Sequence, residues 1–379
     1  MTQARPDRIY LDYNASTPTA PEAAAAMQPF LSHHFGNPSS DHWAGRPARE
    51  AVETARGQVA ALLGCRADEV ILTSGGSEAN NHVVKGLVSA TVASGARTPH
   101  VITTAVEHPA VLEPCRVIEH LGARVTRLPV DGQGLVDPDD IRHAITPHTV
   151  LISVMHANNE VGTVQPVADI GRIAREHQVR FHSDAAQSVG KISARVDDLQ
   201  VDLLSLAGHK LYAPKGIGAL FVRTGVALDP LILGGGHERG QRAGTESALL
   251  ASGLGAACAL AVSDPCEDRL LALREHFWDG LRATFGTRVV LNGHPATRLP
   301  NTLSVAFPGR FGDDILAKLD GVAASTGSAC HTGVQHTSPV LAAMGVPDEV
   351  AFGTIRFSVG RATTAAELDE VVQRLEHCV

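Results

Sequence analysis

Between residues 70 and 222 the chain alternates short apolar runs with longer segments of helical periodicity. The runs have the length and the β-branched content of buried strands and lie at 70–73, 100–104, 124–130, 149–155, 179–182, 202–206 and 217–222. Helices separate several of them, as at 166–177, where a proline opens the first turn and apolar residues line one face. This alternation predicts an α/β fold with a mostly parallel seven-stranded sheet, and it places function at the loops that follow the strands.

A chain of 379 residues is too long for a single compact core, so we expect two domains. After residue 246 the pattern changes to long helices and to short strands near 289–292, 302–307 and 354–359. These features predict a small α+β domain. We place the large domain at 16–260, and the small domain at 1–15 together with 261–379.

Composition excludes several classes of function. The net charge of -8 and the lack of a lysine and arginine block argue against nucleic-acid binding, and no apolar run is long enough to cross a membrane. The polar N-terminus lacks a signal-peptide core, so we expect a cytoplasmic location. Six scattered cysteines without a CxxC pair indicate neither a metal site nor a disulfide framework. The expected partners are small molecules and proteins.

Lys210 ends the segment Ala-Gly-His-Lys, directly after the apolar run at 202–206. A lysine between a buried strand and a tight loop has little access to water, and desolvation disfavours its ammonium form. A neutral amine can form a Schiff base with a carbonyl cofactor. The surroundings of Lys210 therefore favour a nucleophile over an ordinary surface lysine.

Polar side chains follow four strands at the same edge of the predicted sheet. In chain order they are His108, Asn159, Asp184 with Gln187, and His209 with Lys210. Helix caps and turns would explain each of them singly but not their common edge. A pyridine-containing cofactor needs an acid opposite its ring nitrogen, a flat side chain over the ring and a lysine. Asp184 fits the first role and His108 the second.

A glycine-rich turn, Ser-Gly-Gly-Ser-Glu, follows the strand at 70–73. The N–H groups at the start of the helix expected at 79–92, with the hydroxyl of Ser77, can bind an anion such as phosphate. The turn lacks the Gly-Lys-Ser/Thr of a Walker loop. It is also a poor dinucleotide fingerprint, so a dehydrogenase is disfavoured.

Two further segments are small and polar and contain several glycines. The segment 234–245 has no hydrophobic pattern, so it is either disordered or held by another surface, and we expect that surface to belong to a partner subunit. The segment 325–333 contains Cys330, and its composition predicts a loop with an accessible thiol.

Four motifs point to a known family: Ser-Asp-Ala-Ala-Gln ending at Gln187, Ala-Gly-His-Lys ending at Lys210, Gly-Gly-Gly-His-Glu-Arg at 234–239, and Gly-Ser-Ala-Cys ending at Cys330. With them the chain resembles the cysteine desulfurases and selenocysteine lyases of the class V aminotransferase group, over about residues 10–374. The resemblance implies an aspartate-aminotransferase-like fold (fold type I), a homodimer, and pyridoxal 5′-phosphate as cofactor.

The resemblance also implies roles around the cofactor ring. Lys210 would be the Schiff-base lysine, and Asp184 would face the pyridine nitrogen. Gln187 would face the ring hydroxyl, and His108 would lie on the ring and take part in catalysis. Asn159 would contact both the cofactor and the substrate.

The remaining implied roles concern the phosphate, the substrate carboxylate and the sulfur. Gly76, Ser77 and His209 would hold the phosphate, with Thr245 reaching it from the partner subunit. Arg356 would bind the substrate carboxylate together with Asn159. Ala207 stands where many desulfurases have a serine that contacts phosphate, so one hydrogen bond would be missing or replaced by water.

The implied activity converts L-cysteine to L-alanine, with the sulfur passed as a persulfide to Cys330 and then to an acceptor protein. Cys330-His331-Thr332-Gly333 is closer to selenocysteine lyases, so release of selenium from L-selenocysteine is the alternative. A class V aminotransferase or C–S lyase that does not use Cys330 is a third interpretation. A catalytically silent protein that only recruits partners is a fourth, and the intact Lys210, Asp184 and Arg356 argue against it.

Overall fold

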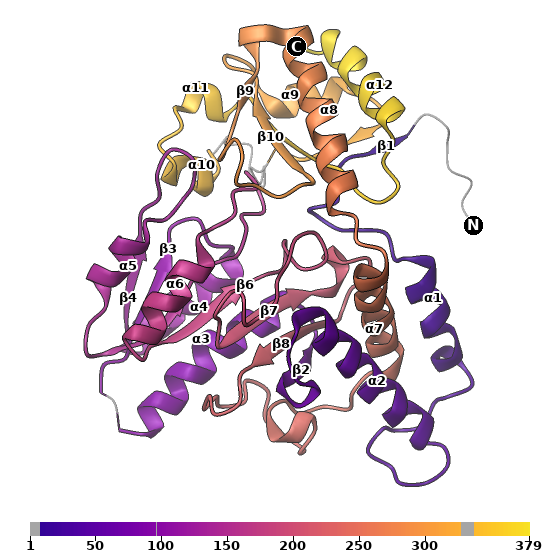
Figure 1. Ribbon diagram of the computed structural model, residues 1–379, viewed down its shortest axis with the longest axis vertical. Coiled ribbons are helices and arrows are strands. Elements are labelled where there is room, and N and C mark those ends of the chain that lie inside the picture. The colour runs from indigo at the N-terminus through magenta and orange to yellow at the C-terminus, as the bar shows by residue number, and fades with distance from the viewer. Residues whose placement is uncertain (1–7, 96, 327–336) are drawn as a thin grey trace.

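The computed structural model describes residues 8–95, 97–326 and 337–379 (Figure 1). Its largest sheet has seven strands. In spatial order they are β2 (Val70–Thr73), β8 (Gly218–Val222), β7 (Leu203–Ala207), β6 (Arg180–Asp184), β5 (Thr149–Ser153), β3 (His100–Thr104) and β4 (Arg124–Leu128). Only β8 runs antiparallel to its neighbours, so the predicted mostly parallel seven-stranded sheet is confirmed.

Helices cover both faces of this sheet. Strand residues alternate between the faces, so that Leu204 packs with α2 (Arg46–Leu63), α6 (Val167–Glu176) and α7 (Ala248–Ser263). Its neighbour Leu203 packs on the other face. The helices on that face are α3 (Gly76–Ala93) and α4 (Pro109–His120). Two shorter helices in this part are α1 (Pro21–Met27) and α5 (Pro138–Ala144).

Helix α3 begins three residues earlier than the sequence pattern predicted. Gly75 has a φ of 151°, which favours glycine, and it turns the chain sharply between β2 and the helix. As a result Gly76 and Ser77 belong to the first helical turn rather than to a loop in front of it.

A second, smaller sheet lies above the large one in Figure 1. It is antiparallel, in the order β12 (Thr354–Ser358), β10 (Thr302–Ala306) and β9 (Val290–Leu291). Side chains of this sheet form a hydrophobic core with α8 (Glu267–Phe285) and α12 (Ala365–Glu376), and these two helices pack against each other. The other elements of this part are α9 (Gly312–Lys318), α10 (Pro339–Ala343) and α11 (Asp348–Ala351).

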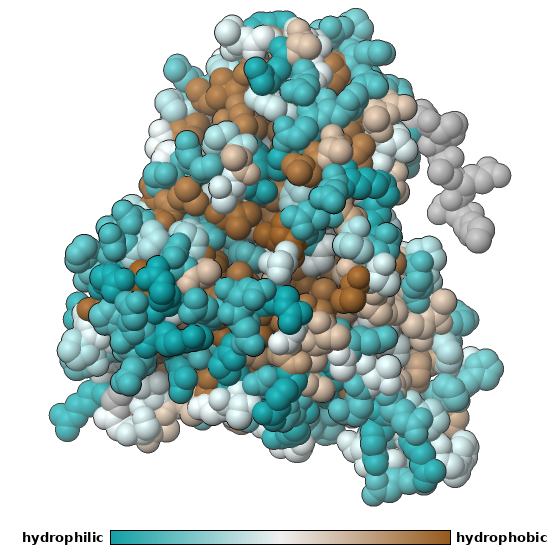
Figure 2. All heavy atoms as spheres, viewed as in Figure 1, coloured by the Kyte–Doolittle hydropathy of each residue, from teal (hydrophilic) through white to brown (hydrophobic). Residues whose placement is uncertain are grey.

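The start of the described chain joins the smaller part. Strand β1 (Ile9–Tyr10) pairs in parallel with β11 (Val322–Ala323), and Ile9 belongs to the same hydrophobic core as α8 and α12. In Figure 2 hydrophilic residues cover most of the outer surface, and hydrophobic ones gather towards the middle of the view. The division at residues 15 and 261 into two domains stays a prediction.

The polar segment 234–245 is held by its own chain. Glu238, 3% exposed, accepts hydrogen bonds from both terminal nitrogens of Arg56 on α2, at 2.6 and 3.1 Å, and from the main-chain N–H of Leu72 at 3.0 Å. Arg242 pairs with Glu78 on α3 at 2.9 Å. Buried charge pairing of this kind can anchor a segment that has no hydrophobic pattern of its own. The segment is thus held at least in part by its own chain, and its contact with a partner subunit stays a prediction.

Among the described residues, no single helix has both the length and the apolar character needed to cross a membrane. The segments 248–263 and 267–288 reach that length and apolar character only when they are taken together, and the angle between them is 78°.

Candidate active site

Eight of the predicted site residues line one cavity of about 170 Å³ at the carboxyl edge of β3, β5, β6 and β7. They are Gly76, Ser77, His108, Asn159, Asp184, Gln187, His209 and Lys210. Because β7, β6, β5 and β3 are direct neighbours in the sheet, the loops that follow them meet at one place. Residues separated by up to 134 positions in sequence thus share one cavity.

Lys210 ends the short 3-10 helix η3 (Gly208–Lys210), which follows β7 directly. Its amine donates a hydrogen bond to the main-chain carbonyl of Asn14. Burial and the positive charge of Arg356 together lower the pKa of Lys210 to about 8, against the opposing effect of Asp184. A substantial fraction of this amine is therefore neutral, and nucleophilic, near pH 8.

Asp184 is the last residue of β6 and is 6% exposed. One carboxylate oxygen accepts a hydrogen bond from the main-chain N–H of Ala186 at 2.9 Å, and the other accepts one from the amide nitrogen of Asn80 at 2.6 Å. The two donors hold this carboxylate in one orientation. The cavity therefore contains an acidic side chain in a fixed position.

His108 is the N-cap of α4, and its Nδ1 accepts a hydrogen bond from the main-chain N–H of Ala110 at 3.0 Å. Burial lowers the pKa of His108; Asp184 raises it and Lys210 lowers it. Since Nδ1 acts as an acceptor, the ring is neutral and carries its proton on Nε2. A flat, uncharged imidazole thus lines the cavity.

His209 is also neutral near pH 7. Burial lowers its pKa to about 4, and the charges of Lys210 and Lys215 act in the same direction. Its Nδ1 lies 3.4 Å from the hydroxyl of Ser16. A neutral imidazole can still donate one hydrogen bond to an anion.

Arg356 on β12 lies beside the cavity rather than among its lining residues. Its guanidinium forms an ion pair with Asp12 at 2.7 Å and donates to the main-chain carbonyl of Asn159 at 3.1 Å. Its Nε has no hydrogen-bond partner within the part of the chain that the structure describes. The predicted carboxylate-binding pair, Arg356 and Asn159, is therefore in direct contact, with Asp12 as the resident anion.

Another predicted residue, Thr245, lies elsewhere. Thr245 lines a separate pocket with Thr73, Ser74 and Gly244 of its own chain. Cys330 falls within 327–336, outside the described residues.

The sequence model of the family described as aminotransferase class-V matches residues 9–371. The chain belongs to the class-V aminotransferase family. A protein of Dictyoglomus turgidum described as "Cysteine desulfurase IscS" is 47% identical over 98% of this chain and 94% of its own length. A protein of Methanosarcina thermophila with the same description is 44% identical over 96% of this chain and 90% of its own length. The family expected from the sequence is confirmed.

Solved structures agree with this assignment. A "NifS-like protein" superposes with a TM-score of 0.90 at 35% identity, covering 98% of both chains. A structure titled "SspA in complex with cysteine" superposes with a TM-score of 0.83 at 38% identity, covering 92% of this chain and 98% of that one. The expected fold, that of fold type I pyridoxal-phosphate enzymes, is confirmed as well.

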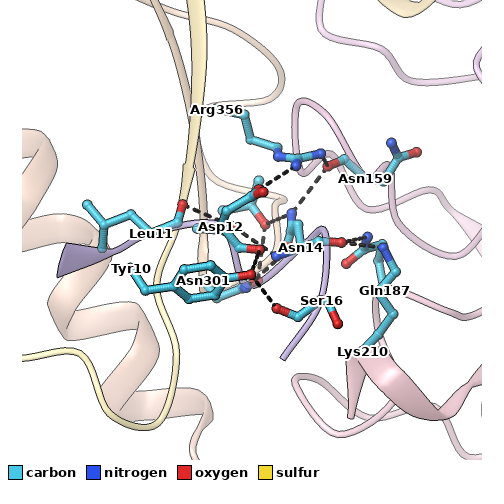
Figure 3. A network of polar contacts seen from close by, with 12 residues as sticks. Tyr10, Leu11, Asp12, Asn14, Ser16, Asn159, Gln187, Lys210, Asn301 and Arg356 are labelled. Atoms are coloured by element: carbon cyan, nitrogen blue, oxygen red, sulfur yellow. Dashed lines mark hydrogen bonds and ion pairs between the residues drawn. The ribbon is translucent and has the colours of Figure 1, made fainter. Parts of the chain in front are cut away.

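The sequence analysis missed two asparagines of this class-V aminotransferase site. Asn80, on the buried face of α3, fixes Asp184, and a polar residue on an otherwise apolar helix face could have signalled it. Asn14 is fully buried, and its main-chain carbonyl accepts from both Lys210 and Gln187 (Figure 3). No local pattern relates Asn14 to residues more than 170 positions away.

Proposed function

We propose that this chain is a pyridoxal-phosphate-dependent cysteine desulfurase. It converts L-cysteine to L-alanine and passes the sulfur as a persulfide to Cys330 and then to an acceptor protein. The observation that carries the proposal is the meeting of Lys210, Asp184 and His108 in one cavity of a class-V aminotransferase chain. Curated relatives described as cysteine desulfurases support it.

The residues of the cavity fit the cofactor. They supply an amine of lowered pKa, a fixed carboxylate and a neutral imidazole, as a protonated pyridine ring with a carbonyl requires. The 18-residue helix α3 starts at the cavity, where a Cβ added to Gly76 would lie 3.3 Å from that of Ala207. Small residues at this point leave the first N–H groups of α3 open to a phosphate.

Five residues of the cavity and Lys210 are assigned to binding the cofactor. Lys210 would hold the carbonyl group of the cofactor, and Asp184 would stabilise the positive charge of its ring nitrogen. Gly76, Ser77 and His209 would hold the phosphate, and His108 would contact the ring. When bound, the ring supplies an electron sink for the charge left at the substrate Cα.

The chain's own groups then act on the substrate. The guanidinium of Arg356 and the amide of Asn159 bind the carboxylate of cysteine, and the substrate replaces Asp12 as the anion at Arg356. Lys210, once released, accepts the Cα proton at its Nζ. The Cys330 thiolate takes the sulfur atom of the substrate, which leaves one alanine and one persulfide for each cysteine and thiol consumed.

Thr245 does not line the cavity of its own chain, and the proposal assigns it to the phosphate of a partner subunit. The functional unit is accordingly a homodimer in which each chain contributes a hydroxyl to the other's site.

Replacing Cys330 by serine tests the proposed function. We expect release of sulfur from L-cysteine to fall at least about 100-fold, because a hydroxyl cannot store sulfur as a persulfide. Alanine and sulfide are measured for the purified, cofactor-loaded protein with L-cysteine and with L-selenocysteine. Cys378→Ser, at a half-buried thiol just past the end of α12, is the matched control and should retain full activity.

Each outcome of this test has a definite meaning. Undiminished sulfur release by Cys330→Ser contradicts the persulfide route and supports a C–S lyase that does not use the thiol. Loss on cysteine with full activity on selenocysteine supports a selenocysteine lyase, as the segment 330–333 suggests by resemblance.

Attachment of the cofactor should depend on pH through Lys210. Only the neutral amine reacts, and with a pKa of about 8 its fraction rises about tenfold between pH 6 and pH 7 and levels off above about pH 9. Cofactor-free protein is mixed with pyridoxal phosphate, and the rate at which the visible band appears is recorded against pH. A rate that still rises tenfold per unit between pH 9 and pH 10 would mean an unshifted lysine.

A further inference from the structure

A second lysine lies behind the cavity. Lys191 comes four residues after Gln187 and is 6% exposed. Its ammonium donates to the side-chain oxygen of Gln187 at 2.9 Å and to that of Asn14 at 3.3 Å. Among the described residues it forms no ion pair, so neutral amide oxygens are its hydrogen-bond partners. A buried cation with neutral partners is costly, and its presence calls for an explanation.

The contact with Gln187 determines how the amide is oriented. An ammonium group has only donors, so the amide atom that faces Lys191 must be the oxygen. At the other end, the amide nitrogen donates one hydrogen to the main-chain carbonyl of Asn14 at 3.0 Å. Gln187 also lines the cavity, and its second N–H remains for whatever the cavity binds.

The same carbonyl of Asn14 accepts from the amine of Lys210. The donor end of Gln187 and the reactive amine therefore meet at one shared acceptor (Figure 3). The second N–H of Gln187 and the amine of Lys210 thus lie at the same part of the cavity, where this N–H would donate to an anionic ring oxygen of a cofactor held by Lys210.

We propose that Lys191 is a positioning residue for the cofactor: it fixes the Gln187 amide so that an N–H, and not the carbonyl oxygen, faces the ring oxygen. The inference rests on the cofactor assignment in the proposed function and not on the identity of the substrate. The charge balance agrees with it. Burial lowers the pKa of Lys191 to about 7, with Lys210 and Arg356 adding to the shift, so an anion in the cavity stabilises the charged form.

The test is a pH titration of the visible absorption band of the cofactor-loaded protein. With Lys191→Met the amide is free to rotate and donates less to the ring oxygen, so that oxygen holds the proton it shares with the Lys210 nitrogen more tightly. We expect the midpoint of the titration to rise by about one pH unit. Lys215→Met is the control, because Lys215 is exposed and screened by water, and its midpoint should equal that of the unmodified protein.

A double-mutant cycle shows whether Lys191 acts through Gln187. In a Gln187→Met background there is no amide to orient, so Lys191→Met should then move the midpoint by less than about a third of its effect alone. An equal shift in both backgrounds would mean that the charge acts directly, and it would overturn the proposal. So would an unchanged midpoint in Lys191→Met.

Lys191→Gln serves if the methionine variant does not fold. It keeps one N–H donor for the amide oxygen, and we expect an upward shift of about half a unit; no shift would again overturn the proposal. Failure of the proposed function would look different, since the unmodified protein would then develop no visible band with pyridoxal phosphate.

Discussion

Replacement of Lys210 by alanine should reduce turnover of L-cysteine at least about 10,000-fold, because one change removes both the covalent anchor of the cofactor and the group that accepts the Cα proton. The lowered pKa of Lys210, about 8, leaves part of this cavity-lining amine neutral near pH 8. Alanine formation is measured under saturating cofactor, together with the visible band of the purified protein.

Lys215→Ala is the matched control for this experiment. It changes an exposed lysine five residues further along the chain, and both its turnover and its band should match the unmodified protein. Addition of a small primary amine to Lys210→Ala should restore part of the turnover if proton transfer is the lost step. A Lys210→Ala protein that keeps a borohydride-reducible cofactor band would show that another lysine holds the cofactor.

Replacement of Glu238 by alanine should lower the free energy of unfolding by about 3 to 5 kcal/mol, since it leaves Arg56 as an unpaired buried charge. The side chain of Arg56 is 3% exposed and that of Glu238 is 1% exposed, and a guanidinium nitrogen lies 2.6 Å from a carboxylate oxygen. Glu53, which also contacts Arg56 at 3.2 Å, is largely exposed and replaces little of the lost pairing. Urea denaturation followed by circular dichroism measures the change.

Glu370→Ala breaks an exposed ion pair with Arg374 on α12 and is the comparison, with an expected loss below about 1 kcal/mol. The double variant Arg56→Met, Glu238→Leu should recover most of the stability, because it leaves neither charge buried alone. Equal losses for Glu238→Ala and Glu370→Ala would mean that the segment 234–245 is held by other contacts.

The sequence was sufficient to predict the strands of the large sheet and the site residues that directly follow those strands. The apolar runs predicted all seven strands of the large sheet within a few residues, and the position of Lys210 after one of them predicted a buried amine. Parallel strands bring their carboxyl ends to one edge, so the convergence of His108, Asp184 and Lys210 followed from chain order alone.

What the sequence could not supply were contacts between distant residues. Asn80, Asn14 and Lys191 form hydrogen bonds at the site with residues far away in sequence, and no periodicity marks such residues. The segment 234–245 was expected to be held by a partner subunit because it has no hydrophobic pattern of its own. The residues that pair with its charges, Arg56 and Glu78, lie more than 160 positions away from the residues they contact.

The contacts of Asn14 also determine when the site can be completed during synthesis of the chain. Its main-chain N–H donates to the hydroxyl of Ser358, 344 residues further on, and its amide nitrogen donates to the hydroxyl of Thr302. A ribosome releases Asn14 and Lys210 long before Ser358 emerges. The carbonyl that receives the Lys210 amine is thus locked in place only after Ser358 has emerged, so the site of a nascent chain stays unfinished until that point.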